Sequence, residues 1–154
     1  MSALMGAGLS ARKRALLSWE LHNIQAFLND FEVTKGIKRS VRLSPSSEVL
    51  LVCNFPLPDN YTPDYINILL DVSAYNAVPP IGLYILNHKN EHTIEQLKNR
   101  VNAFRDTALH SATSVPGYTW LCWSYKDNKW RYREDAPSKG DNICKYINSF
   151  YAIL

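Results

Sequence analysis

The sequence predicts one α+β domain in which helices precede and follow an antiparallel sheet. Three observations predict this class. An apolar repeat of three and four residues opens the chain, alternating apolar residues fill its middle, and a helical repeat returns at its end. The chain has 154 residues, 46% of them hydrophobic, and is long enough to bury a core without disulfides or metals. We therefore expect residues 1–154 to form a single domain.

The first helix is predicted from Ser10 onward. Five apolar residues recur at steps of four and three and form one stripe: Leu17, Leu21, Ile24, Leu28 and Phe31. Ser10 is a suitable N-cap, and Gly36 supplies a stop. Arg12, Lys13 and Arg14 fall in the predicted first turn, where the helix dipole does not favour cations. They therefore form either a solvated basic face or a patch that binds a partner.

Four strands are predicted between residues 37 and 86. They cover residues 37–43, 48–55, 65–72 and 81–86, and a turn at 44–47 joins the first two. The alternation is clearest in the third strand, where Ile66, Ile68, Leu70 and Val72 share one face. Because the three linkers are short, a four-stranded antiparallel meander is the expected topology.

The second half of the chain combines helices with an aromatic segment. The sequence Thr93-Ile94-Glu95-Gln96 has the form of a capping box and predicts a helix that continues to about Leu109. A loop at 111–118 precedes an aromatic segment, 118–125. Asp141 or Asn142 then caps a C-terminal helix whose buried side is predicted to carry Ile143, Ile147, Phe150 and Leu154.

The composition argues against several classes of function. The net charge of +3 is small and the basic residues are scattered, which argues against a nucleic-acid binder that works by electrostatics. Three cysteines without a CxxC spacing argue against a disulfide framework or zinc site and favour a reducing compartment. The aliphatic runs are too short to cross a membrane, and no signal-peptide pattern opens the chain. We expect a cytoplasmic protein without a metal or other cofactor and without nucleic-acid or membrane partners.

Cys122 is the candidate catalytic residue. It lies among four aromatic residues, and a polar loop follows it in which Lys126 and Lys129 could favour the reactive thiolate. The alternative from its residue type is a buried structural thiol. Cys53 lies in a predicted strand and Cys144 in the predicted C-terminal helix, so both are expected to be core cysteines. No histidine stands at a spacing from Cys122 that indicates a catalytic pair.

Several short motifs agree with this choice. Tyr75 and Pro79-Pro80 have the form Tyr-x-x-x-Pro-Pro, and Trp130 follows Cys122 by eight residues. Together with residues 55–61 and the order of the elements, these motifs resemble the ubiquitin-conjugating enzyme family, in particular its divergent bacterial branch. Asn76 replaces the first proline of the family's Tyr-Pro-x-x-Pro-Pro signature. The resemblance covers nearly the whole chain and implies the ubiquitin-conjugating (UBC) fold, with the helix before the cysteine segment as an insertion.

The resemblance implies transthioesterification. The Cys122 thiolate would accept a ubiquitin-like protein from an adenylating activating enzyme, and a lysine amine of a target protein would then attack the new thioester. The family's His-Pro-Asn motif, whose asparagine helps to stabilise the oxyanion, is absent. His110, Ser114 and Asn128 are the candidate replacements, and Asp127 would orient or desolvate the incoming amine.

The resemblance also gives a role to the basic residues of the first helix. In the family this helix meets the activating enzyme, so Arg12, Lys13 and Arg14 become candidate docking residues. The bacterial branch implies a place in an antiviral defence operon. The alternative function is a catalytically inactive UBC-like module that binds a ubiquitin-like protein or partner enzyme, which the missing His-Pro-Asn motif would fit. An unrelated nucleic-acid binder would need exposed aromatic residues on a sheet, whereas their spacing around Cys122 favours core packing.

Overall fold

The computed structural model describes residues 2–31, 36–76, 79–80, 82–101, 115–121 and 130–154. For residues 2–10 only the backbone is described. Along the chain the structure has these elements: α1 (Ser2–Asn29), β1 (Ser40–Leu43), β2 (Val49–Pro56), β3 (Tyr65–Asp71), β4 (Leu83–Leu86), α2 (Glu91–Arg100), β5 (Tyr118–Leu121), a 3₁₀ turn η3 (Pro137–Lys139) and α3 (Ile143–Ala152).

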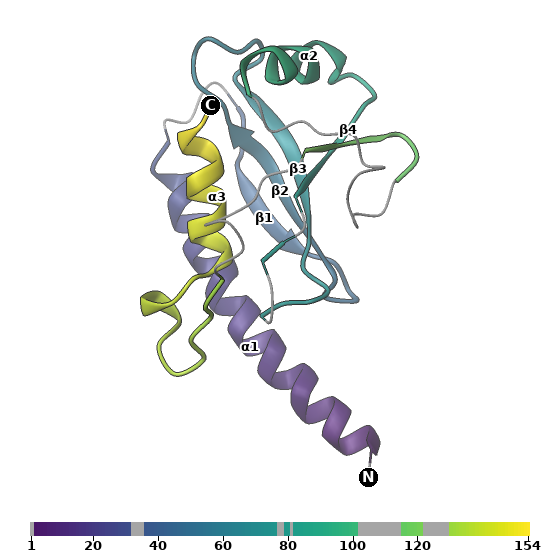
Figure 1. Cartoon of the computed structure of the whole chain (residues 1–154), viewed down its shortest axis with the longest axis vertical. Coiled ribbons are helices and arrows are strands. Elements are labelled where there is room, and N and C mark those ends of the chain that lie inside the picture. Colours follow the sequence, from purple (N-terminus) through teal and green to yellow (C-terminus); the bar gives the residue numbers. More distant parts are fainter. Residues whose placement is uncertain (1, 32–35, 77–78, 81, 102–114, 122–129) are drawn as a thin grey trace.

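The described strands form one antiparallel sheet of five strands in the order β1-β2-β3-β4-β5 (Figure 1). The antiparallel order of the first four strands is confirmed, but the expected count of four is wrong. β5 pairs with β4, with Leu121 opposite Leu83 and Trp120 opposite Tyr84. This strand has only four residues and follows α2 rather than β4 directly, so its sequence carries little signal of the pairing.

The helix boundaries differ from the prediction, first at the start of α1. α1 begins at Ser2 rather than at Ser10, because the alanine, leucine and methionine residues before Ser10 are strong helix formers. Arg12, Lys13 and Arg14 therefore lie about three turns into the helix and not in its first turn.

The helix expected from Thr93 to about Leu109 is present, but with other bounds. α2 begins at Glu91, and Thr93 is a buried residue inside it, so Thr93 forms no N-cap. The helix ends at Arg100 because Val101 has extended backbone angles, with φ −116° and ψ 117°. The remainder of the predicted helix, residues 102–109, lies outside the described residues.

The C-terminal helix agrees with the prediction at its start, but it ends at Ala152, so Leu154 lies beyond it and is only half-buried. Asn142 occupies the N-cap position of α3, and its Oδ1 accepts a hydrogen bond from the backbone N–H of Lys145 at 2.8 Å. Asp141, the other candidate cap, instead accepts a hydrogen bond from the backbone N–H of Arg131 at 2.7 Å. Ile143, Ile147 and Phe150 are buried as expected.

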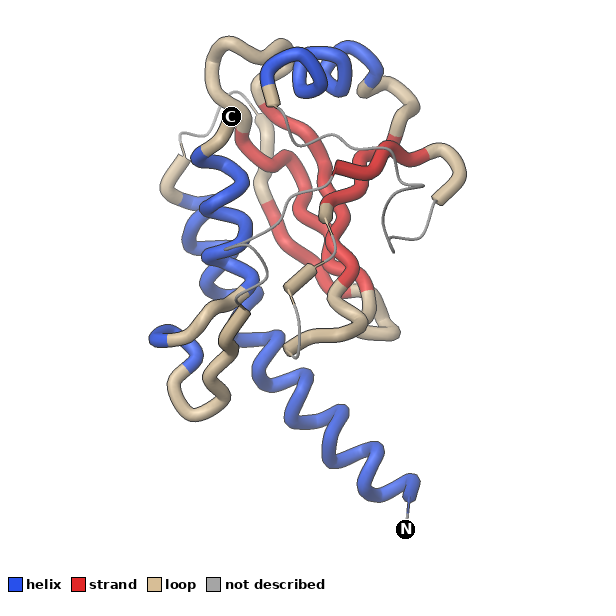
Figure 2. The backbone as a smooth tube through the Cα atoms, viewed as in Figure 1, coloured by secondary structure: helices blue, strands red, loops and turns tan. Residues whose placement is uncertain are grey.

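The core lies between the sheet and the pair α1 and α3, which run side by side (Figures 1 and 2). α1 contributes its buried stripe, and α3 contributes Phe150, whose ring centroid lies 5.8 Å from that of Phe55. The beginning of α1 extends away from the body of the protein. Within the described parts of the chain, no helix is both long and apolar enough to cross a membrane.

Gly82, just before β4, allows a close contact between β4 and β5. Its φ of +72° lies in the left-handed region, and a Cβ there would overlap the Trp120 indole and the carbonyl oxygen of Leu121. We expect Gly82→Ala to lower the free energy of unfolding by about 2–3 kcal/mol, through backbone strain and overpacking. Denaturant unfolding measures this change.

Gly117 provides the matched control for this substitution. Its φ of +84° is similar, but a Cβ there would have no atom of the described residues within 4 Å. Gly117→Ala should therefore cost only the backbone strain, about 1 kcal/mol. Equal losses of unfolding free energy in Gly82→Ala and Gly117→Ala would show that the overlap with Trp120 does not contribute to the destabilisation.

Candidate functional site

The five residues predicted to take part in catalysis all lie outside the described residues. Cys122, Asp127 and Asn128 belong to 122–129, and His110 and Ser114 belong to 102–114. The described residue directly before Cys122 is Leu121, which is fully buried and is the last residue of β5. The polypeptide that leads to Cys122 therefore starts from an edge strand of the sheet, and the solvent access of its thiol stays a prediction.

Hydrogen bonds join the turn after β3 to the chain that begins at Trp130. The indole Nε1 of Trp130 donates to the backbone carbonyl of Asn76 at 3.0 Å, and the Tyr75 hydroxyl donates to the Tyr132 hydroxyl at 2.7 Å. Asn76 Nδ2 also donates to Glu134 Oε1 at 3.1 Å. Two segments more than 50 residues apart in sequence are thus fixed to each other, and both carry residues of the predicted motifs.

The three basic residues predicted to dock a partner have different surroundings. Arg12 forms an ion pair with Glu134, although its side chain is still 65% exposed. Lys13 is half-buried, and its Nζ donates to the carbonyl of Ser73 at 3.2 Å. Arg14 is exposed. Arg12 and Lys13 therefore bind α1 to residues of neighbouring loops. Replacing Arg14 disturbs neither of these contacts, so Arg14 is the simplest of the three to test as a docking residue.

Glu20 is a buried charged group that the sequence prediction missed. It is 0% exposed, and its Oε2 accepts a hydrogen bond from the backbone N–H of Ile143 at 2.8 Å. Burial raises its pKa to about 7, although the backbone amides of Ile143 and Cys144 and the Tyr75 hydroxyl act in the opposite direction. The sequence did contain a signal, because Glu20 lies three residues after Leu17 and four before Ile24, on the buried stripe.

The other two cysteines are half-buried rather than fully buried. Cys144 packs against the core, and burial, followed by the nearby Glu20 charge, raises the pKa of its thiol to about 11. Cys53 lies on β2, and Arg42 donates from Nη2 to its Sγ at 3.7 Å. The prediction of core cysteines therefore holds only in part, since both side chains keep some exposure.

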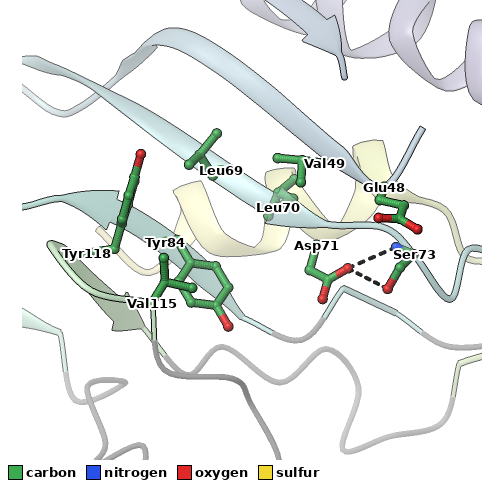
Figure 3. A pocket seen from close by; sticks show the side chains of 9 residues that line it. All are labelled: Glu48, Val49, Leu69, Leu70, Asp71, Ser73, Tyr84, Val115 and Tyr118. Carbon is green, nitrogen blue, oxygen red and sulfur yellow. Dashed lines mark hydrogen bonds between the residues drawn. The ribbon is translucent and has the colours of Figure 1, made fainter. Parts of the chain in front are cut away.

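A groove of about 340 Å³ lies on the sheet face opposite α3 (Figure 3). Its lining combines apolar and aromatic side chains with polar ones at one end: Val49, Leu69, Leu70, Tyr84, Val115 and Tyr118, followed by Glu48, Asp71 and Ser73. Ser73 donates to Asp71 Oδ1 from its backbone N–H at 2.9 Å and from its hydroxyl at 2.7 Å. Burial, followed by the negative charge of Asp71, raises the pKa of Tyr84.

The described residues contain no group of three or more His, Cys, Asp or Glu side chains that could hold a metal ion. Comparison of the chain with protein-family models, with curated proteins and with solved structures finds no match.

Proposed function

We propose that this protein is a ubiquitin-conjugating-type transferase whose nucleophile is Cys122. The observation that carries the proposal is the hydrogen bond from Trp130 to the carbonyl of Asn76, which joins the two segments on which the resemblance rests. The chain leaves the sheet at Leu121 and is fixed again at Trp130. Anchors therefore flank the segment that contains Cys122 on both sides, as a positioned nucleophile requires.

The proposed reaction has two steps. The Cys122 thiolate attacks the thioester carbonyl that links a ubiquitin-like protein to the adenylating activating enzyme, and the enzyme's own thiolate leaves. A lysine amine of the target protein then attacks the new thioester, an amide bond forms, and the Cys122 thiolate leaves as the amine loses a proton. Asp127 would orient the amine, and Asn128, His110 or Ser114 would donate to the oxyanion.

A loading reaction tests this proposal. The purified protein is mixed with ATP and with the adenylating enzyme and ubiquitin-like protein encoded beside its gene, in the antiviral defence operon that we propose. A conjugate that forms only with ATP and disappears on addition of a reducing thiol supports the proposal. A complete reaction that yields no such conjugate contradicts it.

Arg14→Glu is expected to slow loading if α1 binds the activating enzyme. We expect roughly a tenfold loss of loading rate at 20 mM salt and less than about threefold at 300 mM, because salt screens an exposed charge. Lys98→Glu is the matched control, since Lys98 is an exposed cation on α2. Equal loading by wild type and Arg14→Glu at both salt concentrations would remove Arg14 from the docking surface.

The second candidate function is a binding module without catalysis. The groove of Figure 3 favours it, because it offers apolar side chains next to the carboxylates of Glu48 and Asp71. Its partner would be the ubiquitin-like protein or the partner enzyme, bound through an apolar surface that carries a basic residue. Val49 is 39% exposed at this groove, which makes it a suitable position for a test.

Val49→Asp is expected to weaken this binding at least tenfold, because it places a charge on an apolar contact surface. Leu86→Asp is the matched control, since Leu86 is 41% exposed, lies on β4 and does not line the groove. Calorimetric titration with the ubiquitin-like protein and with the adenylating enzyme measures both variants. Identical affinities for wild type and Val49→Asp would exclude the groove as the binding surface.

A further inference from the structure

Glu20 lies where α1, α3 and the chain between β5 and α3 meet. Its side chain is fully buried, and Oε2 accepts the backbone N–H of Ile143, the first residue of α3. Its second oxygen, Oε1, is also buried and makes no hydrogen bond within the described part of the chain. A carboxyl group in this position is stable only if its charge is compensated or if it keeps its proton.

The groups that face this carboxyl compensate a negative charge only in part. The backbone amides of Ile143 and Cys144 and the Tyr75 hydroxyl favour the charged form, but burial outweighs them. The Tyr132 phenol, in the chain before α3, and the thiol of Cys144 on α3 are also nearby, and neither carries a positive charge. Glu134 and Arg12, which form an ion pair, are charged groups of the same region, and burial, followed by the charges of Glu20 and Glu134, raises the pKa of Tyr132. No basic side chain among the described residues contributes to the pKa of Glu20.

The neighbours of Glu20 on α1 itself also carry no charge. The positions three and four residues away, which share its side of the helix, are Leu16, Leu17, Asn23 and Ile24. Loss of the Glu20 proton would therefore place a negative charge among weak acids and apolar side chains. Water is the partner that such a charge needs, and water can reach it only if the elements around it separate.

The Tyr75–Tyr132 bond indicates which elements would separate. It closes the cluster on the side of residues 130–142, the segment that leads into α3. The segment touches α1 again through the ion pair of Glu134 with Arg12. Residues 130–142 therefore cover the carboxyl. They lie outside the α-helices and strands, with a 3₁₀ turn at Pro137–Lys139, and irregular chain of this kind opens locally more readily than a core helix or strand.

We propose that Glu20 is a proton-controlled latch: in its protonated form it holds residues 130–142 and the first turn of α3 against α1, and loss of the proton releases them. Since burial raises the pKa of Glu20 to about 7, the release falls in the neutral range. The latch does not depend on the transferase chemistry proposed above.

Amide hydrogen exchange of the wild-type protein tests the latch between pH 5 and pH 8, after correction for the intrinsic exchange rate. We expect the protection of the Ile143 and Cys144 amides to fall at least tenfold over this range. The ceiling over this range is about 70-fold, from a pKa of about 7 in the closed state and the ordinary 4.5 in the open state, because the open state is already largely ionised at pH 5. The Val101 amide, which donates to Leu97 within α2, should keep constant protection.

Two variants sharpen this test. Glu20→Gln should give constant protection at Ile143 and Cys144, because the amide oxygen can still accept but cannot titrate. Glu134→Gln, which removes the neighbouring carboxylate, should keep the fall seen in the wild type. Constant protection in the wild type, or an equal fall in Glu20→Gln, would overturn the latch.

A direct titration covers the case in which Glu20→Gln does not fold. The ¹³C chemical shift of the Glu20 carboxyl in the wild-type protein reports its ionisation. A midpoint near 7 supports the latch. A midpoint near 4.5 overturns it, because the proton would then already be lost while the segment is closed.

Discussion

Cys122→Ala is expected to abolish the reductant-sensitive conjugate with the ubiquitin-like protein, whereas Cys53→Ala and Cys144→Ala should load at close to the wild-type rate. The thioester is made on a sulfur atom, so alanine at the nucleophile leaves no residual path for transfer. Each of the three variants removes one thiol from the same chain and leaves the other two in place. The loading reaction followed on a non-reducing gel therefore compares the three thiols directly.

The surroundings of Cys144 explain why we do not expect it to replace Cys122. With a pKa of about 11 in the closed structure, only about one buried Cys144 in several thousand would be a thiolate near pH 7.5. The nearby Glu20 charge acts in the same direction as burial. Cys144→Ala should therefore remove a thiol that reacts too slowly to be loaded.

Cys53 is the more stringent control. It is half-buried on β2, so its thiol keeps some exposure to a reaction partner, and Arg42 donates from Nη2 to its sulfur at 3.7 Å. A conjugate that survives in Cys122→Ala and disappears in Cys53→Ala would move the nucleophile to the sheet. A conjugate that is unchanged in all three variants would not be a thioester of this protein.

The sequence predicted those elements whose pattern is local. The stripe through Leu17, Ile24 and Leu28 predicted the buried face of α1, and the alternation in residues 65–72 predicted β3. Hairpin linkers are short, so the first four strands could be ordered as well. β5 was missed because its partner, β4, is more than 30 residues earlier in the chain and its four residues carry no clear alternation.

The candidate site depends on contacts that a sequence pattern does not contain. The motif comparison selected Tyr75 and Trp130, but the bonds that join their segments run through the carbonyl of Asn76 and the hydroxyl of Tyr132. The partner of Arg12 is Glu134, which is over 100 residues away in sequence. Glu20 was missed for a different reason. A glutamate on an amphipathic helix is usually exposed, but this one is buried where α3 packs against α1.

Glu20→Gln is expected to remove a large part of the pH dependence of stability. Since burial raises the pKa of Glu20 from 4.5 to about 7, the folded protein keeps a proton that the unfolded chain has already released between these pH values. The folded state then binds more protons than the unfolded state, so the free energy of unfolding falls as the pH rises from 4.5 to 7. Above pH 7 both states are ionised and the loss stays constant, at about 3 kcal/mol.

Urea unfolding at pH 4.5 and at pH 8 measures this effect as a difference between wild type and variant, in which the other titrating groups cancel. At each pH we compare the free energy of unfolding of Glu20→Gln with that of the wild type. This difference should be about 3 kcal/mol more favourable to the variant at pH 8 than at pH 4.5, because glutamine has no proton to lose. Glu95→Gln is the matched control, since Glu95 is exposed on α2 and should follow the wild-type curve. Parallel curves for wild type and Glu20→Gln would mean that the buried carboxyl ionises without penalty, because the amides of Ile143 and Cys144 and the Tyr75 hydroxyl then compensate its charge in full.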